Sequence, residues 1–401
     1  MFNLIQRLTL HYNNFIPRQK FFTLFFLGCK NKKMIDYSNI RFARSRADFF
    51  PTLTQRVNQY FKANAIGKNA NSEMVVKTVF MFMLYFVPYG VLIFGGFTSL
   101  WFMAAMAVVM GLGKAGIGLS VMHDANHGGY SSNPIVNKLM GFSLNIIGGN
   151  AFNWIVQHNV LHHTFTNVHD VDEDISPRGV LRMAPDSDWK PIHRFQHWYA
   201  WFFYGLLTFV WILFKDFSRL ARYTATGLVA KQKASIVREW IILLISKSMY
   251  FGYIWVIPYF VLGIAWWQIF LGFFIMHYIS GFILAIIFQP AHVIEGTEYP
   301  NPDIDGNLEN NWAIHQLHTT TNFAQKSKIF SWYVGGLNFQ VEHHLFPQIC
   351  HVHYRKIAPI VEATAKEFGI PYKSKRTFMI ALAAHWRLMK ELGKKPQLAV
   401  A

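Results

Sequence analysis

The chain has 401 residues, of which 52% are hydrophobic, 17% aromatic and 15% charged. This composition excludes a disordered chain and favours a membrane protein. The net charge of +17 suits an anionic membrane surface or an acidic partner better than nucleic acid, because the basic residues lie between apolar blocks. Two cysteines, Cys29 and Cys350, are too few for a disulfide framework or a thiolate metal site, whereas 18 histidines are present.

Residues 1–38 are predicted to form a basic extension ahead of one domain, residues 39–401. Residues 1–33 contain no acidic side chain, and their apolar run at 21–28 is too short to span a bilayer. No signal-peptide cleavage site follows that run. Two interpretations stay open. Either translation starts at Met34 and 1–33 lie upstream of the true start, or these residues form a basic amphipathic segment on a membrane surface.

Four stretches approach the length of about 20 apolar residues that a transmembrane helix needs. They are residues 78–97, 98–120, 240–263 and 264–288. Within them the only Lys or Arg residues are Lys114 and Lys247. Because positive residues mark the cytoplasmic side, two hairpins with both termini and both polar segments in the cytoplasm are expected. A soluble helical protein is the disfavoured alternative.

Two further apolar stretches, 134–157 and 199–214, are interrupted or short. We interpret both as interfacial or re-entrant, because one extra crossing would place the histidine clusters on opposite sides of the membrane. The predicted fold is therefore an all-α integral membrane protein. Four transmembrane helices form two hairpins, and a cytoplasmic helical domain carries the histidines.

Three histidine clusters lie in the predicted cytoplasmic segments. They are His123-Asp-Ala-Asn-His127, His158-Asn-Val-Leu-His162-His163 and Gln340-Val-Glu-His343-His344. Residues four apart share a helix face, so the first two clusters can each present a pair of imidazoles to one metal. His163 is turned by about 100° from His162, so an adjacent pair can serve two ions.

The number of histidines favours two metal ions, at about four or five ligands each. Imidazole suits iron, copper, zinc and nickel. The cluster histidines together with His315, in the segment Asn311-Trp-Ala-Ile-His315, nearly fill two such sites, and Asn311 or Gln340 could bind directly or through water. The carboxylate di-iron motif Glu-x-x-His and the zinc-peptidase motif His-Glu-x-x-His are absent from the sequence.

Acidic residues beside the clusters are candidates for hydrogen bonds to the ligands. A metal-bound histidine usually donates its other ring N–H to a carboxylate or a carbonyl. Asp124, Asp170 and Glu342 are suitably placed along the chain. The run of acidic residues at 172–174 is interpreted instead as a solvated loop.

The clusters resemble the histidine boxes H-x-x-x-H, H-x-x-x-H-H and Q-x-x-H-H of the membrane fatty-acid desaturase family. The likeness covers residues 39–395 and includes HDANHGGYS at 123–131, QHNVLHHTFTN at 157–167 and GLNFQVEHHLFP at 336–347. The glutamine that opens the third box is similar to that of front-end desaturases, which insert a double bond between an existing one and the carboxyl end. The chain looks most like bacterial linoleoyl-CoA desaturase-type proteins.

This resemblance implies oxygen-dependent insertion of a cis double bond into an acyl-CoA or acyl-lipid chain, with two irons as cofactor and O2 as co-substrate. The implied iron ligands are His123, His127, His158, His162, His163, His343 and His344. Segment 311–323 matches the region that supplies a further ligand, which we place on His315, with His318 as the weaker candidate. His292 is a candidate for a metal ligand, for a residue that supports a ligand, or for a structural role.

The sequence lacks the His-Pro-Gly-Gly haem motif of a fused cytochrome b5 domain. The resemblance therefore implies a separate electron donor, a cytochrome b5 or a ferredoxin with its reductase. Such donors are commonly acidic, which would suit the basic cytoplasmic face. We expect a bacterial inner membrane, with the endoplasmic reticulum as the alternative.

Two other functions stay open at this point. A membrane hydroxylase on the same scaffold would share the boxes. A metal transporter would need ionisable groups inside the spans, where only Lys114, Lys247 and His277 occur. The position of the new bond, the choice between CoA and phospholipid substrates, and the oligomeric state are not fixed by the sequence.

Overall fold

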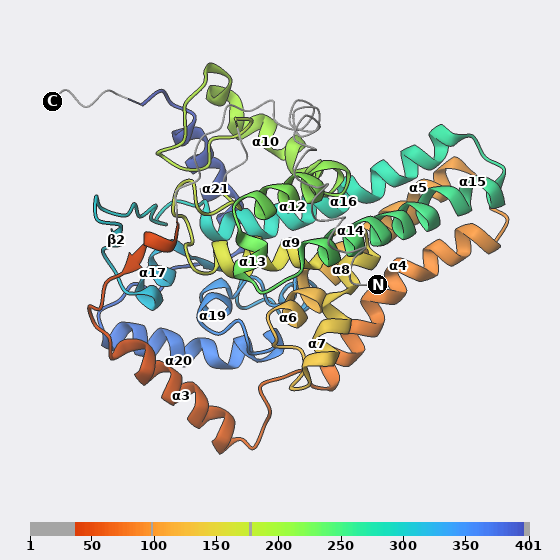
Figure 1. Ribbon diagram of the computed structural model, residues 1–401. Coiled ribbons are helices and arrows are strands. Elements are labelled where there is room, and N and C mark those ends of the chain that lie inside the picture. Colours follow the sequence, from red (N-terminus) through yellow and green to blue (C-terminus); the bar gives the residue numbers. More distant parts are fainter. Residues whose placement is uncertain (1–36, 98, 176–178, 397–401) are drawn as a thin grey trace, which may run out of the picture. The chain divides into compact units, whose positions relative to one another are not determined.

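The computed structural model describes residues 37–97, 99–175 and 179–396, and most of them are helical (Figure 1). The chain divides into Met1–Asp36 and Tyr37–Ala401, and the described residues belong to the second unit. The hypothesis about translation from Met34 lies outside them. The predicted helical class is confirmed. Two-residue strands form two parallel pairs: β1 (Arg41–Phe42) with β2 (Asn307–Leu308), and β3 (Asn322–Phe323) with β4 (Ser374–Lys375).

Four helices in the described part of the chain are long and apolar enough to cross a membrane, as predicted. They are α4 (Ser72–Phe94), α5 (Leu100–Gly116) continued by η4 (Ile117–Val121) and α6 (Met122–Asn126), α14 (Ile236–Phe251) continued by η8 (Gly252–Val256) and α15 (Ile257–Leu262), and α16 (Trp266–His292). A bent pair, Pro191–Gly205 with Leu207–Ala225, turns by 58° and would make a fifth span only if counted as one.

Helix α5 packs against both α4 and α16 (Figure 1). Glycines allow this close approach. A Cβ on Gly113 would lie 2.6 Å from the Tyr85 nitrogen, and one on Gly111 would lie 2.8 Å from the Met276 carbonyl oxygen. Small residues at such contacts let membrane helices pack backbone to backbone. The second and fourth long helices therefore form a tight pair, and both end in histidines.

The buried lysines of the spans hold a turn close to the second histidine cluster. Lys247 donates to the Gly148 carbonyl and to Asp216 Oδ2, both at 2.6 Å. Lys114 donates to the Ile147 carbonyl. Because Gly148 has a φ of +98°, its backbone leaves the helix and exposes these carbonyls to the two ammonium groups.

The two stretches that we interpreted as interfacial or re-entrant are broken into short helices. They comprise α7 (Pro134–Gly141), α8 (Ser143–Ile146), α9 (Ala151–Ile155) and η5 (Val156–His162), and then η6 (Pro191–Phe195), α10 (Gln196–Gly205), α11 (Leu207–Val210), η7 (Trp211–Lys215), α12 (Asp216–Ala225) and α13 (Leu228–Lys231). None of the individual pieces has the length that a span requires. Their placement at a membrane surface stays a prediction.

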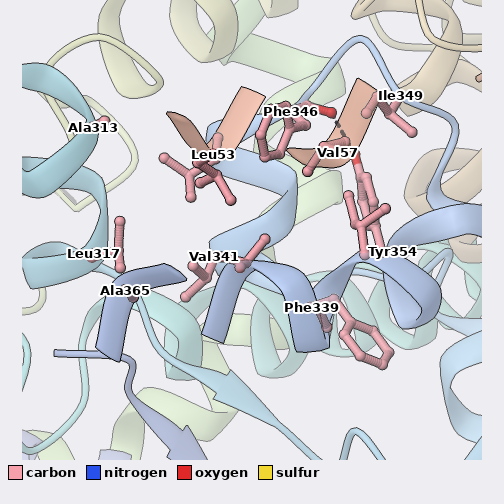
Figure 2. Close-up of a cluster of buried hydrophobic side chains, with 14 of the residues drawn as sticks. Leu53, Val57, Ala313, Leu317, Phe339, Val341, Phe346, Ile349, Tyr354 and Ala365 are labelled. Carbon is pink, nitrogen blue, oxygen red and sulfur yellow. Dashed lines mark hydrogen bonds between the residues drawn. The ribbon is translucent and has the colours of Figure 1, made fainter. Parts of the chain in front are cut away.

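Four of the remaining helices build a separate apolar core beside the third histidine cluster (Figure 2). They are α3 (Phe49–Ala63), α17 (Trp312–Thr319), α19 (Gln340–Leu345) and α20 (Tyr354–Glu367). The others among the remaining described helices are η3 (Tyr37–Asn39), α18 (Lys328–Tyr333), η9 (His351–His353) and α21 (Phe378–Leu392). Leu53 and Val57 of α3 share this core with Val341 of α19. The apolar residues of α19 thus point into the core, and its histidines are free to face the other way.

Candidate metal centre

The first histidine cluster lies on α6, directly after the π-helical turn η4. His123 and His127 are buried, and their ring centroids lie 4.8 Å apart. The predicted helical spacing is therefore present. The Trp154 ring packs against both imidazoles, at 5.4 Å from His123 and 5.5 Å from His127, and excludes water from that side.

The second cluster lies on η5, which is a π-helical turn and not the α-helix that we assumed. The His163 N–H donates to the His158 carbonyl at 2.8 Å, a bond that spans five residues. Single π turns of this kind are frequent at functional sites. The wider turn brings His163 Nε2 to 3.2 Å from His158 Nε2, while the His162 ring stacks on His158 at 5.1 Å.

The third cluster lies on α19, and both of its histidines face the second cluster. His343 Nε2 lies 2.9 Å from His163 Nε2. The His344 ring is stacked on the His163 ring at a centroid distance of 4.3 Å. His163 therefore contacts both members of the adjacent pair His343 and His344.

The ring nitrogens converge in three overlapping groups. Within each group, one nitrogen from every histidine lies within 4.8 Å of the others. The groups are His123, His127, His158 and His343; His162, His292 and His344; and His163, His343 and His344. All these side chains are buried. The arrangement gives two neighbouring sets of donors joined through the third group.

Neither of the two histidines that we had ranked for the additional position belongs to one of these groups. His292, at the end of α16, lies in one group with His162 and His344. His315 lies outside the three groups, and its Nε2 donates to the Thr166 carbonyl at 2.8 Å. His318 is also outside them and contacts Glu298 Oε1 at 2.6 Å.

The two amides proposed as extra ligands, Asn311 and Gln340, differ in whether their polar atoms already have hydrogen-bond partners. Asn311 caps α17, where its Oδ1 accepts from the Ile314 N–H at 3.0 Å and its Nδ2 donates to the Ser45 carbonyl at 2.6 Å. Gln340 is fully buried, and neither polar atom of its side chain has a hydrogen-bond partner among the described residues. Of the two amides, Gln340 is the one whose side-chain atoms have no hydrogen-bond partner within 3.5 Å in the described part of the chain, and its side chain faces His292.

The acidic run at 172–174 is not the solvated loop that we expected. Asp172 is fully buried, and its Oδ2 lies 2.9 Å from His162 Nδ1. Asp174 Oδ2 lies 3.4 Å from His158 Nδ1. The interpretation failed because solvent exposure of an acidic run depends on where the chain folds. Here both carboxylates orient imidazoles of the second cluster.

Asp124, Glu342 and Asp170 have other neighbours. Asp124 Oδ2 lies 2.7 Å from His351 Nδ1, and its Oδ1 lies 4.0 Å from His123 Nδ1, which is beyond hydrogen-bond distance. Glu342 accepts from Asn322 at 2.9 Å and Tyr372 at 2.8 Å. Asp170 Oδ1 lies 3.5 Å from His169 Nε2.

The electrostatic setting keeps most of the cluster imidazoles neutral. Burial lowers the pKa of His158, His163 and His343 well below the usual value, and neighbouring imidazoles lower it further. Burial also disfavours the charge on His162, but the Asp172 carboxylate outweighs this effect and raises its pKa. Neutral imidazole is the form that binds a metal.

The donor atoms fit a metal centre because many of them are otherwise unsatisfied. His162, His292 and His344 each bury an Nε2 without a hydrogen-bond partner among the described residues, as does His127. A buried polar atom without a partner costs about 1–3 kcal/mol. Ions at the two sets of nitrogens would remove this cost.

The sequence analysis missed the contacts of three residues with the clusters: it took Asp172 and Asp174 for part of a solvated loop, and it did not consider Gln316. Gln316 Oε1 lies 2.8 Å from His344 Nδ1. Only their proximity to the boxes along the chain could have drawn attention to the two acids. No local pattern marks Gln316, since it approaches His344 through the packing of α17 against α19.

Comparison with known proteins decides the family. The profile described as fatty acid desaturase matches residues 99–376. The chain belongs to the fatty acid desaturase family. The desaturase is thus an oxidoreductase with long apolar helices of an integral membrane protein, and its buried histidines fit the metal site typical of that family.

Individual relatives cover nearly the whole desaturase. It is 35% identical to the sn-1 linoleoyl-lipid 6-desaturase of Arthrospira platensis over 362 residues, which cover 90% of this chain and 96% of the relative. It is 34% identical to the protein of the same name from Synechocystis, with 90% and 99% covered. An acyl-lipid (8-3)-desaturase of Physcomitrium patens is 38% identical, with 86% and 72% covered.

Proposed function

We propose that this desaturase inserts a cis double bond into the linoleoyl chain of a membrane lipid, on the carboxyl side of the existing double bonds. The convergence of buried imidazoles at the ends of α5–α6 and α16 carries this proposal. The names of the cyanobacterial relatives, which specify linoleoyl-lipid substrates, support a lipid over a CoA ester. Residues 39–401 would form the enzyme domain.

The proposed cofactor is a pair of irons. One would be held by His123, His127, His158 and His343, and the other by His162, His292 and His344, with His163 between them. His292 takes the position that the sequence analysis assigned to His315, because it contributes a free nitrogen and His315 does not. When bound, two irons supply an oxidant made from O2 and two electrons, strong enough to remove hydrogen from an unactivated methylene.

The residues around the histidines orient the imidazole rings and exclude water from the site. Asp172 and Asp174 contact the Nδ1 atoms of His162 and His158, so the Nε2 atoms of these rings are presented to the metals. Trp154 packs against both histidines of the first cluster. A site closed to water protects reactive species from side reactions, and the acyl chain must enter it past apolar side chains.

The electrons would come from a separate donor, a cytochrome b5 or a ferredoxin with its reductase. We propose that the metal centre and both termini face the cytoplasm, as the distribution of Lys and Arg predicts. The cyanobacterial relatives support a bacterial membrane.

Product analysis tests the proposal. The chain is expressed in a host fed with linoleate, and the fatty acids of each lipid class are profiled by gas chromatography and mass spectrometry, with His343→Ala as control. We expect a more unsaturated acid in the lipid fraction that is absent from the variant. A hydroxy acid would establish a hydroxylase instead. No product, with an electron donor supplied, would refute the fatty-acyl substrate.

A further inference from the structure

Gln316 lies outside the histidine boxes but connects two of them. Its side chain is fully buried on α17 and contacts both the second and the third cluster. Oε1 lies 2.8 Å from His344 Nδ1 and 2.8 Å from Thr166 Oγ1. Nε2 donates to the His163 carbonyl at 3.2 Å. Two of these partners belong to a histidine box, and Thr166 lies three residues after the second box.

The His163 carbonyl fixes the orientation of the amide. A carbonyl oxygen can only accept, so the atom of Gln316 that faces it must be the NH2 group. The same carbonyl accepts from Trp312 Nε1 at 3.0 Å, which uses its second lone pair. Oε1 must then face His344, and turning the amide over would place two oxygens 3.2 Å apart.

The orientation of the amide in turn fixes the tautomer of His344. Because Oε1 can only accept, His344 Nδ1 must carry the proton. His344 Nε2 is then a bare lone pair. That atom is buried without a hydrogen-bond partner among the described residues, and His344 shares a donor group with His162 and His292.

We propose that Gln316 is a positioning residue that holds His344 in its metal-binding tautomer. We also propose that it gives His344 Nδ1 an uncharged hydrogen-bond partner, where His162 has a carboxylate. The contrast with His162 is the reason for the second part. His162 Nδ1 faces the Asp172 carboxylate at 2.9 Å, whereas His344 Nδ1 faces an amide. A carboxylate partner makes an imidazole a more basic ligand than an amide partner does. The inference rests on the pair of irons proposed above.

Helix α17 therefore contributes orientation and not a ligand. Trp312, His315 and Gln316 all bond to backbone carbonyls of residues 163 or 166, at the end of the second box. The resemblance assigned a ligand to this segment. Its contacts indicate that it braces the second box against α19.

The test compares two substitutions at Gln316 with a matched buried glutamine. Gln316→Leu removes the hydrogen bonds, and Gln316→Glu keeps an acceptor for His344 but makes it a carboxylate. Gln196→Leu is the control, because Gln196 is also fully buried and makes three hydrogen bonds to backbone groups, of Arg182 and Met389. Each full-length protein is purified in detergent, and ferrous iron affinity is measured anaerobically against a chelator, followed by the reduction potential.

We expect Gln316→Leu to bind one of its two irons about 10- to 100-fold more weakly. Gln196→Leu should lower the unfolding temperature and leave both iron affinities unchanged. Gln316→Glu loses the hydrogen bond to the His163 carbonyl but keeps an acceptor for His344 Nδ1, so it should still bind both irons. Its reduction potential should be lower than that of the wild type, because the more basic His344 stabilises the oxidised ion.

Two results would overturn the inference. One is a Gln316→Leu protein that binds both irons as tightly as the wild type. The other is an equal loss of iron in Gln196→Leu, which would make the effect one of general stability. A wild-type protein that binds no iron is a different failure, since it would refute the proposed cofactor and not the role of Gln316.

Discussion

The imidazoles of the metal centre differ in the group that their Nδ1 atom faces. The Nδ1 atoms of His162 and His158 face the carboxylates of Asp172 and Asp174. His344 Nδ1 faces an amide oxygen, and His292 Nδ1 lies 3.3 Å from the Thr319 carbonyl. Such partners set ring orientation and ligand basicity. Substituting a residue that faces one of these Nδ1 atoms should therefore change metal binding although every histidine is kept.

Asp172→Asn is the clearest such change. The amide keeps an acceptor near His162 Nδ1 but removes the negative charge that makes His162 a strong ligand. We expect iron affinity to fall by about 10- to 100-fold, as measured by competition with a chelator. Asp188→Asn, at an exposed position, is the control. Unchanged affinity in Asp172→Asn would show that the carboxylate only supports the fold.

The lowered histidine pKa values predict acid sensitivity of the metal-free protein. In the folded state His158, His163 and His344 stay neutral well below the usual histidine pKa, whereas in the unfolded state they bind protons below about pH 6.5. The unfolded state then binds more protons, so stability falls as the pH falls, by up to about 1.4 kcal/mol per pH unit for each such group. His162 acts in the opposite direction, because its pKa is raised.

Thermal unfolding of the metal-free protein at about pH 7.5 and about pH 5.5 checks this expectation. The midpoint should be clearly lower at the acid pH. A midpoint that is equal or higher there would mean that these histidines are already charged in the folded state.

Among the elements, the π turn η5 and the turn at 147–150 determine where the second cluster points. Lys114 and Lys247 hydrogen-bond to carbonyls of the turn at 147–150. Helix α9 begins directly after this turn and continues into η5. Asn150 begins α9 by accepting from the Asn153 N–H at 2.8 Å. A change in the buried charges of α14 should therefore disturb the fold near the metal centre.

Lys247→Met leaves the Asp216 carboxylate buried without its cation. Removing one partner of a buried ion pair costs about 3–5 kcal/mol. We expect a loss of that size in the free energy of unfolding, measured by denaturant titration in detergent. The double variant Lys247→Met with Asp216→Asn should recover much of it, because no unpaired charge is left. A single variant as stable as the wild type would contradict the pairing.

At the scale of elements, the sequence predicted what depends on local pattern. The four long helices follow from long apolar runs, and the structure extends each predicted span at one end and shortens it slightly at the other. The π turn was not predictable, because residues 156–162 carry no signal that separates it from an α-helix. The solvated-loop interpretation of 172–174 failed because burial is decided by tertiary packing.

For the whole molecule, the proposed orientation places the turns between paired spans opposite the metal centre. A Cys29→Ser background leaves one buried thiol, Cys350. Ala265→Cys lies at the exposed turn between α15 and α16, and Ala230→Cys lies at an exposed position of α13. A membrane-impermeant maleimide should label Ala265→Cys in intact cells and Ala230→Cys only after lysis. The reverse pattern would invert the topology.

At the same scale, the composition of the centre was only partly predictable. The three boxes could be found because their members lie close together along the chain. His292 could be named only as one candidate among several, and Gln316 could not be found at all, since their positions beside the other residues depend on how α16, α17 and α19 meet. His315 matched the expected spacing, but its Nε2 is occupied by the Thr166 carbonyl.

The central claim is that the gathered imidazoles bind two irons with His292 among the ligands. Iron per chain, counted in purified wild type, His292→Ala and His315→Ala, tests it most directly. We expect two irons in the wild type and in His315→Ala, and a loss of at least one in His292→Ala. A wild type without iron, or a loss in His315→Ala but not in His292→Ala, would contradict it.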